Sequence, residues 1–166
     1  MEIYLDKLKE ADKEELFQFE CENRAFFEKM VPSRGNQYYQ FENFTESISE
    51  LLKEQREGIS YFHLIKHSGT IIGRMNLVDI VAGRGDLGYR MGEKYAGKGF
   101  ASKALHMLLQ KVREYNLEEI HAKTTNLNIQ SQKVLEKNHF KRISVDYEEP
   151  DFNGQKIKFY HYIWKN

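Results

Sequence analysis

The sequence has little of what stabilises small secreted domains or divides long chains. Cys21 is the one cysteine in 166 residues, so neither an internal disulfide nor a cysteine-rich zinc site is available. Proline occurs twice, and no internal repeat or Gly/Ser linker interrupts the chain. These absences exclude a collagen-like or low-complexity chain, and they predict one domain over residues 1–166 in a reducing compartment. Cys21 is expected to be a small core residue of a helix.

An excess of charge of either sign is also missing, because 25 Lys and Arg balance 25 Asp and Glu. A strongly basic surface for nucleic acid is therefore not predicted. No apolar run approaches the ~18 residues of a membrane span. The start of the chain carries charges where a signal peptide has apolar residues. We predict a cytoplasmic protein with no nucleic acid or membrane partner.

Hydrophobic residues make up 40% of the chain and aromatics 13%, which is enough for a core. Their spacing in the first third predicts an edge strand near Ile3 and Leu5, a helix from an N-cap at Asp12 to about residue 30, and a second helix over residues 45–58. The segment from Met30 to Phe44, between these helices, is rich in Tyr and Phe and has no clear period. We expect it to border the pocket for the second substrate and to set its selectivity.

The rest of the chain alternates strands and helices. Strands are predicted over residues 61–67, 70–80, 86–91, 118–125, 141–147 and 156–164, and helices over 101–112 and 128–138. Ser68-Gly69 and Asn153-Gly154 are hairpin turns by composition. This order predicts an α/β (α+β) fold in three layers on a mixed sheet.

The most informative segment is the glycine-rich turn from Ala96 to Ser102, between a strand and the most periodic helix. Free N–H groups in the first helical turn make such a segment an anion site, especially for a pyrophosphate. A P-loop is excluded because Phe100 follows Gly97-Lys98-Gly99, and a dinucleotide fingerprint is weakened because Ser102 replaces its third glycine. The spacing alone is also compatible with a turn in which the glycines have only a structural role. No metal site is predicted, since His63 and His67 are four residues apart on a strand.

Two segments together carry a family resemblance. Residues 88–105, with Gly99 and Ala101 at two fixed positions, resemble the acetyl-CoA-binding motif of the GNAT acetyltransferase superfamily, although Ala96 replaces its Gln or Arg. Residues 128–140 resemble a second block of the branch that contains the ribosomal-protein N-terminal acetyltransferases, with His139 in place of a glycine. The similarity covers about residues 60 to 140. It implies a mostly antiparallel sheet of about seven strands, splayed in the middle, with helices on both faces.

The resemblance also implies how acetyl-CoA, a cosubstrate used without metal, is held. Backbone amides of the turn would bind the pyrophosphate, and the pantetheine arm would pair along the strand that contains Tyr89 and Met91. Asn128 would orient this arm, and Lys133 would add charge near the phosphates. The residues implied to bind the cosubstrate are Tyr89, Met91, Gly97, Lys98, Gly99, Phe100, Ala101, Ser102, Asn128 and Lys133.

Acetyl transfer to an amine gives three further roles. The resemblance places the backbone N–H of Met91 at the thioester oxygen and the Ser131 hydroxyl at the departing sulfur. A carboxylate can take the proton of the amine, and Asp86 is the first candidate, with Asp79 or water as alternatives. The resemblance favours a protein N-terminus as acceptor. A small amine such as a polyamine, amino acid or aminoglycoside stays open, as do a non-catalytic acyl-CoA-binding module and a monomer or homodimer.

Overall fold

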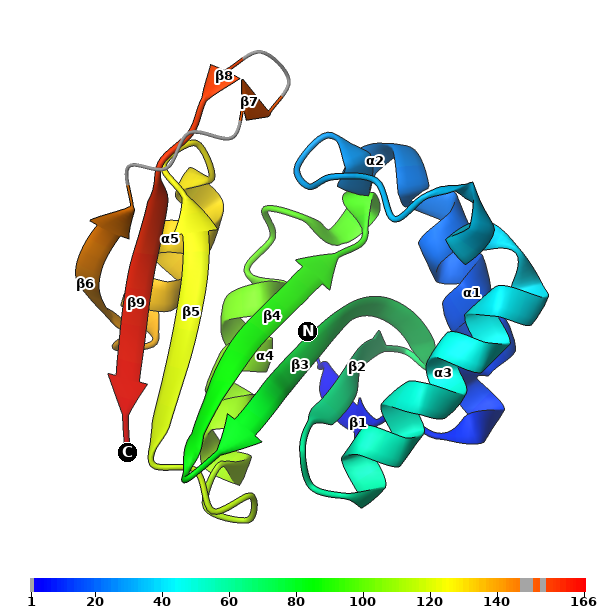
Figure 1. The fold of residues 1–166 in the computed structure, drawn as a ribbon, viewed down its shortest axis with the longest axis horizontal. Helices are drawn as coiled ribbons and strands as arrows, with labels where there is room; N and C mark the ends of the chain where they lie inside the picture. Colours follow the sequence, from blue (N-terminus) through cyan, green and yellow to red (C-terminus); the bar gives the residue numbers. More distant parts are fainter. Residues whose placement is uncertain (1, 147–150, 153–154) are drawn as a thin grey trace.

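The computed structural model describes residues 2–146, 151–152 and 155–166, and its centre is a seven-stranded sheet in the order β1-β2-β3-β4-β5-β9-β6 (Figure 1). Neighbouring strands are antiparallel except β4 and β5, which are parallel. The strands of this sheet are β1 (Tyr4–Lys7), β2 (Tyr61–His67), β3 (Thr70–Val81), β4 (Arg84–Met91), β5 (Glu119–Thr125), β6 (Lys141–Asp146) and β9 (Phe159–Lys165). The predicted fold class, edge strand and first hairpin are confirmed.

Helices cover both faces of the sheet. In Figure 1, α4 and α5 lie behind it, and α1, α2 and α3 lie on the right of the view. The helices are α1 (Lys13–Glu22), α2 (Arg24–Glu28), α3 (Phe41–Arg56), α4 (Phe100–Lys111) and α5 (Ile129–Lys137), with 3-10 turns η1 (Glu10–Asp12), η2 (Asn36–Tyr39) and η3 (Glu93–Tyr95). No helix within the described residues combines the length and apolarity needed to cross a bilayer.

Two apolar clusters hold these layers together. The stripe of α4 is buried as its period predicts, because Ala104, Leu105 and Leu108 are fully enclosed against Ile72 and Met75 of β3. On the opposite face, α1 and α3 bury a second cluster against β2 and β3. Its members are Leu8, Leu16, Phe19, Phe27, Phe44, Ile48, Phe62, Leu64 and Ile71. The early helices therefore pack onto the central sheet through this second cluster.

The sheet opens between its two parallel strands. β4 and β5 pair over four residue pairs, from Arg84↔Glu119 to Leu87↔Ala122, and then diverge (Figure 1). Each strand stays paired on its other side, β4 with β3 as far as Met91 and β5 with β9 as far as Thr125. The predicted splay is thus confirmed, and it leaves two facing strand edges without a strand between them.

The first predicted helix is wrong in detail. The chain breaks at Asn23 into α1 and α2, and the Asp12 carboxylate does not cap α1 but accepts the N–H of Lys9 at 2.9 Å. Cys21 is exposed rather than buried, because the inward face of α1 is occupied by Leu16, Phe19 and Glu20.

The last predicted strand is also divided. β8 (Gln155–Lys156) pairs with the short β7 (Asp151–Phe152), and β9 begins only at Phe159. The predicted Asn153-Gly154 turn and the Tyr147 end of the preceding strand lie outside the described residues.

His63 is a buried structural residue of β2. One ring nitrogen, Nδ1, lies 3.3 Å from the carbonyl of Met75, and Nε2 lies 2.8 Å from the Tyr115 hydroxyl. Because a carbonyl only accepts, Nδ1 carries the proton and Nε2 accepts from the phenol. Burial lowers the pKa of His63 to about 4, so the ring is neutral at pH 7. Among the described residues, no group of three or more His, Cys, Asp or Glu could hold a metal ion.

The end of α5 forms a Schellman motif with an unusual residue at its turn. The N–H of Phe140 donates to the carbonyl of Leu135 at 3.0 Å, and the N–H of His139 donates to that of Glu136 at 3.1 Å. His139 has φ +68°, the left-handed conformation that glycine adopts without a Cβ clash. The left-handed backbone explains why the family has glycine at this position, and His139 replaces that glycine in this chain.

We expect His139→Gly to raise the free energy of unfolding by about 1 kcal/mol, because it removes the left-handed strain of an exposed residue. The matched control is His106→Gly, at an exposed position inside α4. This variant should lower the free energy of unfolding by roughly 1 kcal/mol. Urea unfolding measures both. Equal destabilisation by the two variants would contradict the strain argument.

Candidate functional site

A cavity of about 800 Å³ lies where the sheet opens. Its walls are the end of β4, η3, the start of α4, one side of α5 and the α2 segment. Of the predicted site residues, those that line it are Tyr89, Met91, Gly97, Gly99, Phe100, Ala101, Ser102, Asn128, Ser131 and Lys133. Lys98 is exposed and is not among the lining residues, and Asp86 lies elsewhere. The two sequence blocks therefore meet at one site.

The glycine turn presents its backbone to this cavity. Gly97 and Gly99 have φ +73° and +85°, so the chain can enter α4 only with residues that tolerate the left-handed region. A Cβ at Gly99 would meet no atom within 4 Å, whereas one at Gly97 would lie 3.0 Å from the Gln130 side chain. The open side of Gly99 and the orphan amides of the first α4 turn fit a pyrophosphate.

The N–H of Met91 points into the gap between β4 and β5. The next residue, Gly92, donates its N–H to the carbonyl of Ile72 in β3 at 2.8 Å. Successive N–H groups of an extended strand point to opposite sides, so the N–H of Met91 faces away from β3. The strand edge thus offers donors to a chain that enters the gap.

Two hydroxyls meet beside this edge. The Tyr89 hydroxyl donates to Ser131 Oγ at 3.1 Å, and the Asn128 side-chain oxygen accepts the N–H of Ser131 at 3.1 Å. Asn128 is therefore the N-cap of α5. Burial raises the pKa of Tyr89, so its phenol keeps its proton and acts as the donor. The proton of Ser131 is then free to point toward another acceptor in the cavity.

Asn138 fixes α5 against the start of α4. Its amide nitrogen lies 3.1 Å from Ser102 Oγ and 2.9 Å from the carbonyl of Val134. Asn138 is buried, so these bonds hold the two helices in a defined arrangement beside the cavity. These bonds therefore fix the position of Ser131 relative to the glycine turn.

The structure does not bring Asp86 to this cavity. Asp86 lines a smaller one of about 260 Å³, together with the alternative base Asp79 and with His121 of β5. Asp86 lies five positions before Met91 on β4, which corresponds to ~17 Å along the strand. A carboxylate at that distance is outside hydrogen-bond reach of an amine at Met91, so direct proton transfer to Asp86 does not fit this geometry.

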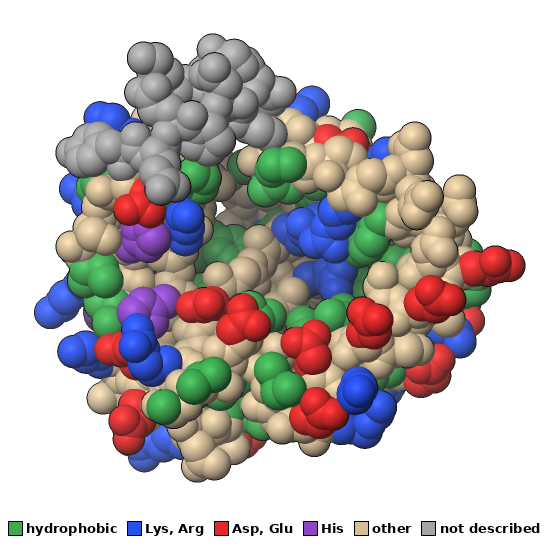
Figure 2. Space-filling model, viewed as in Figure 1, with side chains coloured by type: hydrophobic (Ala, Val, Ile, Leu, Met, Phe, Trp, Pro, Cys, Tyr) green, Lys and Arg blue, Asp and Glu red, His purple; other side chains and the backbone are tan. Residues whose placement is uncertain are grey.

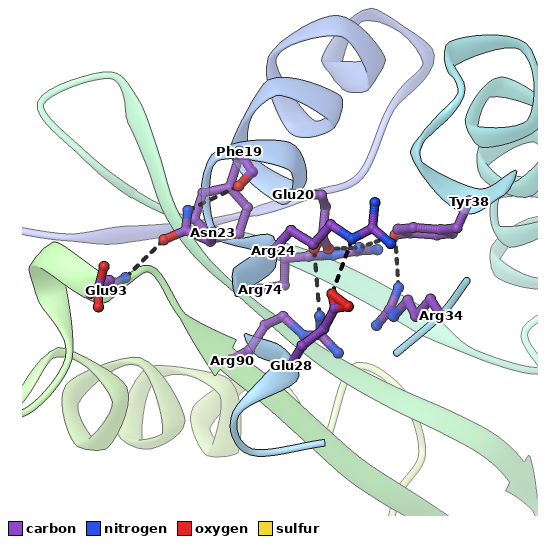
Figure 3. Close-up of polar contacts among 10 residues, drawn as sticks. All are labelled: Phe19, Glu20, Asn23, Arg24, Glu28, Arg34, Tyr38, Arg74, Arg90 and Glu93. Atoms are coloured by element: carbon purple, nitrogen blue, oxygen red, sulfur yellow. Dashed lines mark hydrogen bonds and ion pairs between the residues drawn. The ribbon is translucent and has the colours of Figure 1, made fainter. Parts of the chain in front are cut away.

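A buried ion-pair network forms the other wall, and it is absent from the sequence-based predictions. Glu20 of α1 is fully buried, and its carboxylate contacts Arg74 of β3 and, at 3.5 Å, Arg90 of β4 (Figure 3). The Arg90 guanidinium also lies over the Phe27 ring, 4.6 Å from its centroid. Arg90, Phe26, Phe27, Met30 and Val31 all line the cavity.

The segment before α3 joins this network. Arg34 donates to the Tyr38 hydroxyl at 2.7 Å, and Arg74 approaches the same oxygen at 3.4 Å (Figure 3). Arg24 forms a separate pair with Glu28 at 3.0 Å. The expected contribution of this segment to the cavity thus comes from Met30 and Val31, while Tyr38 contacts the arginines behind them. No local motif could have revealed a network assembled from separate elements.

A sheet opened beside a glycine-rich helix start is the arrangement of an acyl-CoA-dependent N-acetyltransferase. The family profile described as an acetyltransferase (GNAT) domain matches residues 2–141. The chain belongs to the GNAT acetyltransferase family, whose enzymes use acetyl-CoA.

Similar proteins agree with this assignment. The probable N-acetyltransferase YjcK of Bacillus subtilis (strain 168) is 28% identical over 159 residues, which cover 92% of this chain and 87% of that protein. The ribosomal-protein-S5-alanine acetyltransferase from Vibrio fischeri superposes with a TM-score of 0.91 at 20% identity, covering 100% and 94% of the two chains. The ribosomal L7/L12 α-N-protein acetyltransferase RimL, in complex with coenzyme A, superposes with a TM-score of 0.87 at 19% sequence identity. The match covers 98% of this chain and 93% of that protein. At these identities, the two structures show a shared fold.

Proposed function

We propose that this enzyme transfers acetyl from acetyl-CoA to the α-amine of a protein N-terminus, directly within a ternary complex. The supporting observation is that one cavity extends from the glycine turn to the Arg90 wall through the gap in the sheet. A cosubstrate on one side and an acceptor on the other would thus meet at Met91. Similarity to enzymes named for ribosomal-protein N-termini supports this class of acceptor.

The residues present fit the cosubstrate. The amides from Gly97 to Ser102 would bind the pyrophosphate, and Lys133 would add a positive charge from α5. The edge of β4 at Tyr89 and Met91 would pair with the pantetheine amides as an added strand does. Bound acetyl-CoA supplies the thioester whose carbonyl carbon the amine attacks.

Three groups would then serve the transfer. The amine nitrogen forms the new C–N bond, the C–S bond breaks, and CoA leaves as the thiol. The Met91 N–H would stabilise the negative charge on the carbonyl oxygen, and Ser131 would donate to the departing sulfur. The amine proton would leave through water, with Asp86 or Asp79 as a distant acceptor. An α-amine suits such a site, since its pKa of about 7.7 to 8.0 leaves part of it neutral at pH 7.

The acceptor class is tested by thiol release from acetyl-CoA with three amines. We expect a peptide with a free N-terminus to react, and the same peptide with a blocked N-terminus and an internal lysine to be inert. A polyamine is the third acceptor. Turnover of the polyamine with no turnover of the free peptide would establish the small-amine alternative, and no turnover with any amine would favour a binding module.

Gly99→Glu should weaken CoA binding at least ~10-fold, because it places bulk and negative charge against the pyrophosphate. The matched control is Gly69→Glu in the β2–β3 turn, which has a similar φ of +77° and no atom within 4 Å of its Cβ. The control carries the same backbone strain away from the cavity. Calorimetric titration of both folded variants with CoA tests the assignment, and equal affinities would overturn it.

Ser131→Ala should lower kcat about 10-fold or more with little change in CoA affinity, because a donor to a developing negative charge is lost. The deficit should persist at high pH, since it does not concern the amine. Tyr89→Phe should lower kcat less, because Ser131 keeps its proton but loses the hydroxyl that orients it.

The double variant Tyr89→Phe/Ser131→Ala separates catalysis from packing. If Ser131→Ala lowers kcat only because the buried Tyr89 hydroxyl loses its hydrogen-bond acceptor, the double variant should recover kcat. We expect no recovery. Wild-type kcat in Ser131→Ala would show that the thiolate leaves without this residue.

A further inference from the structure

Three arginines converge where α1 faces the end of β4. This arginine cluster consists of Arg34, Arg74 and Arg90, which come from the segment before η2, from β3 and from β4. Figure 3 shows them around the Glu20 carboxylate and the Tyr38 hydroxyl. In the space-filling view of Figure 2, Lys and Arg side chains gather inside the hollow at the centre of this face.

The cluster has more positive charge than its partners neutralise. Glu20 is its one carboxylate partner among the described residues, and Tyr38 contributes a hydroxyl. The neighbouring Arg24 and Glu28 neutralise each other. Three guanidinium groups therefore share one negative charge. The pKa of Arg90 is lowered, first by burial and then by Arg34, which is the effect of an incompletely paired cation.

A structural role accounts for only part of this charge. The contact between Glu20 and Arg74 joins α1 to β3, and both side chains are almost fully buried. Arg90 adds only a 3.5 Å contact through one nitrogen, although a guanidinium has five N–H donors. The Arg90 side chain is 20% exposed, and Arg34 is exposed. Arg90 lines the cavity and keeps donors that an anion there can reach, and the exposed Arg34, which donates to the Tyr38 hydroxyl, belongs to the same cluster.

The position of the arginine cluster sets how far the bound anion would lie from the reacting amine. Arg90 precedes Met91, and its side chain lies on the opposite face of β4 from those of Tyr89 and Met91. That face is the one toward Phe27 and the early helices. Successive residues of an extended peptide are ~3.3–3.6 Å apart, so a guanidinium near Met91 reaches a group one or two residues beyond the amine.

We infer that the acceptor carries a carboxylate on the second residue of its N-terminus, and that Arg90 and Arg34 bind this group. The inference rests on the proposed function and narrows it to acidic N-termini. Charge-assisted bonds from guanidinium to carboxylate give both orientation and selectivity. The same positive charge disfavours the protonated form of a nearby amine, which helps a site without a carboxylate base within reach.

The test compares peptides that differ only at the second residue, Glu, Gln or Lys. Thiol release gives kcat/KM for each, and wild-type enzyme should favour Glu over Gln ~10-fold or more, with Lys lowest. Arg34→Gln and Arg90→Gln should each bring the Glu/Gln ratio toward one. The matched control Arg113→Gln removes an exposed arginine that follows α4 and should leave the ratio unchanged.

The outcomes separate this inference from the function on which it rests. A wild-type Glu/Gln ratio near one, or a ratio that neither Arg34→Gln nor Arg90→Gln alters, would overturn it. Because Arg34 is exposed, its variant keeps the test valid if Arg90→Gln does not fold. If small amines react and no peptide does, the proposed N-terminal function fails. The kcat/KM for glutamate relative to that for glutamine as acceptors then shows whether the site still prefers a carboxylate.

Discussion

The separation of β4 from β5 beyond Leu87 and Ala122 is the constraint on which the rest of the structure depends. Each strand is held by its other neighbour, so the two cannot close on each other without losing pairs with β3 or β9. The gap turns a continuous sheet into a passage with donors on its edge, including the N–H of Met91. The glycine turn, the Tyr89–Ser131 pair and Arg90 all acquire their positions from this opening.

Glu20 supplies the second constraint, on the acceptor side. Its buried carboxylate contacts arginines of two strands, so α1 and the segment that leads to α2 are placed relative to the opening. Leaving either charge buried without the other would be costly. The arrangement therefore fixes the charged wall of the cavity to which we assign binding of the acceptor's carboxylate.

Sequence reasoning predicted the parts of the site that are local in the chain. The α4 stripe, the hairpin at Ser68-Gly69 and the glycine turn each need only neighbouring residues, and each is where the spacing placed it. Glu20 and Arg90 are 70 positions apart, so no spacing rule relates them. Asp86 shows a different limit. Its place in a motif gave its order along β4, but not which cavity its side chain would line.

If acetyl-CoA pairs with the open edge of β4 as proposed, its binding also stabilises the folded chain. Ligand that binds only the folded chain adds about 2.7 kcal/mol of stability at a concentration 100 times its Kd. In a cell rich in acetyl-CoA, fewer molecules would open far enough for proteolysis. Binding of acetyl-CoA at the proposed site in the gap between β4 and β5 would thus couple the stability of the folded chain to the supply of its cosubstrate.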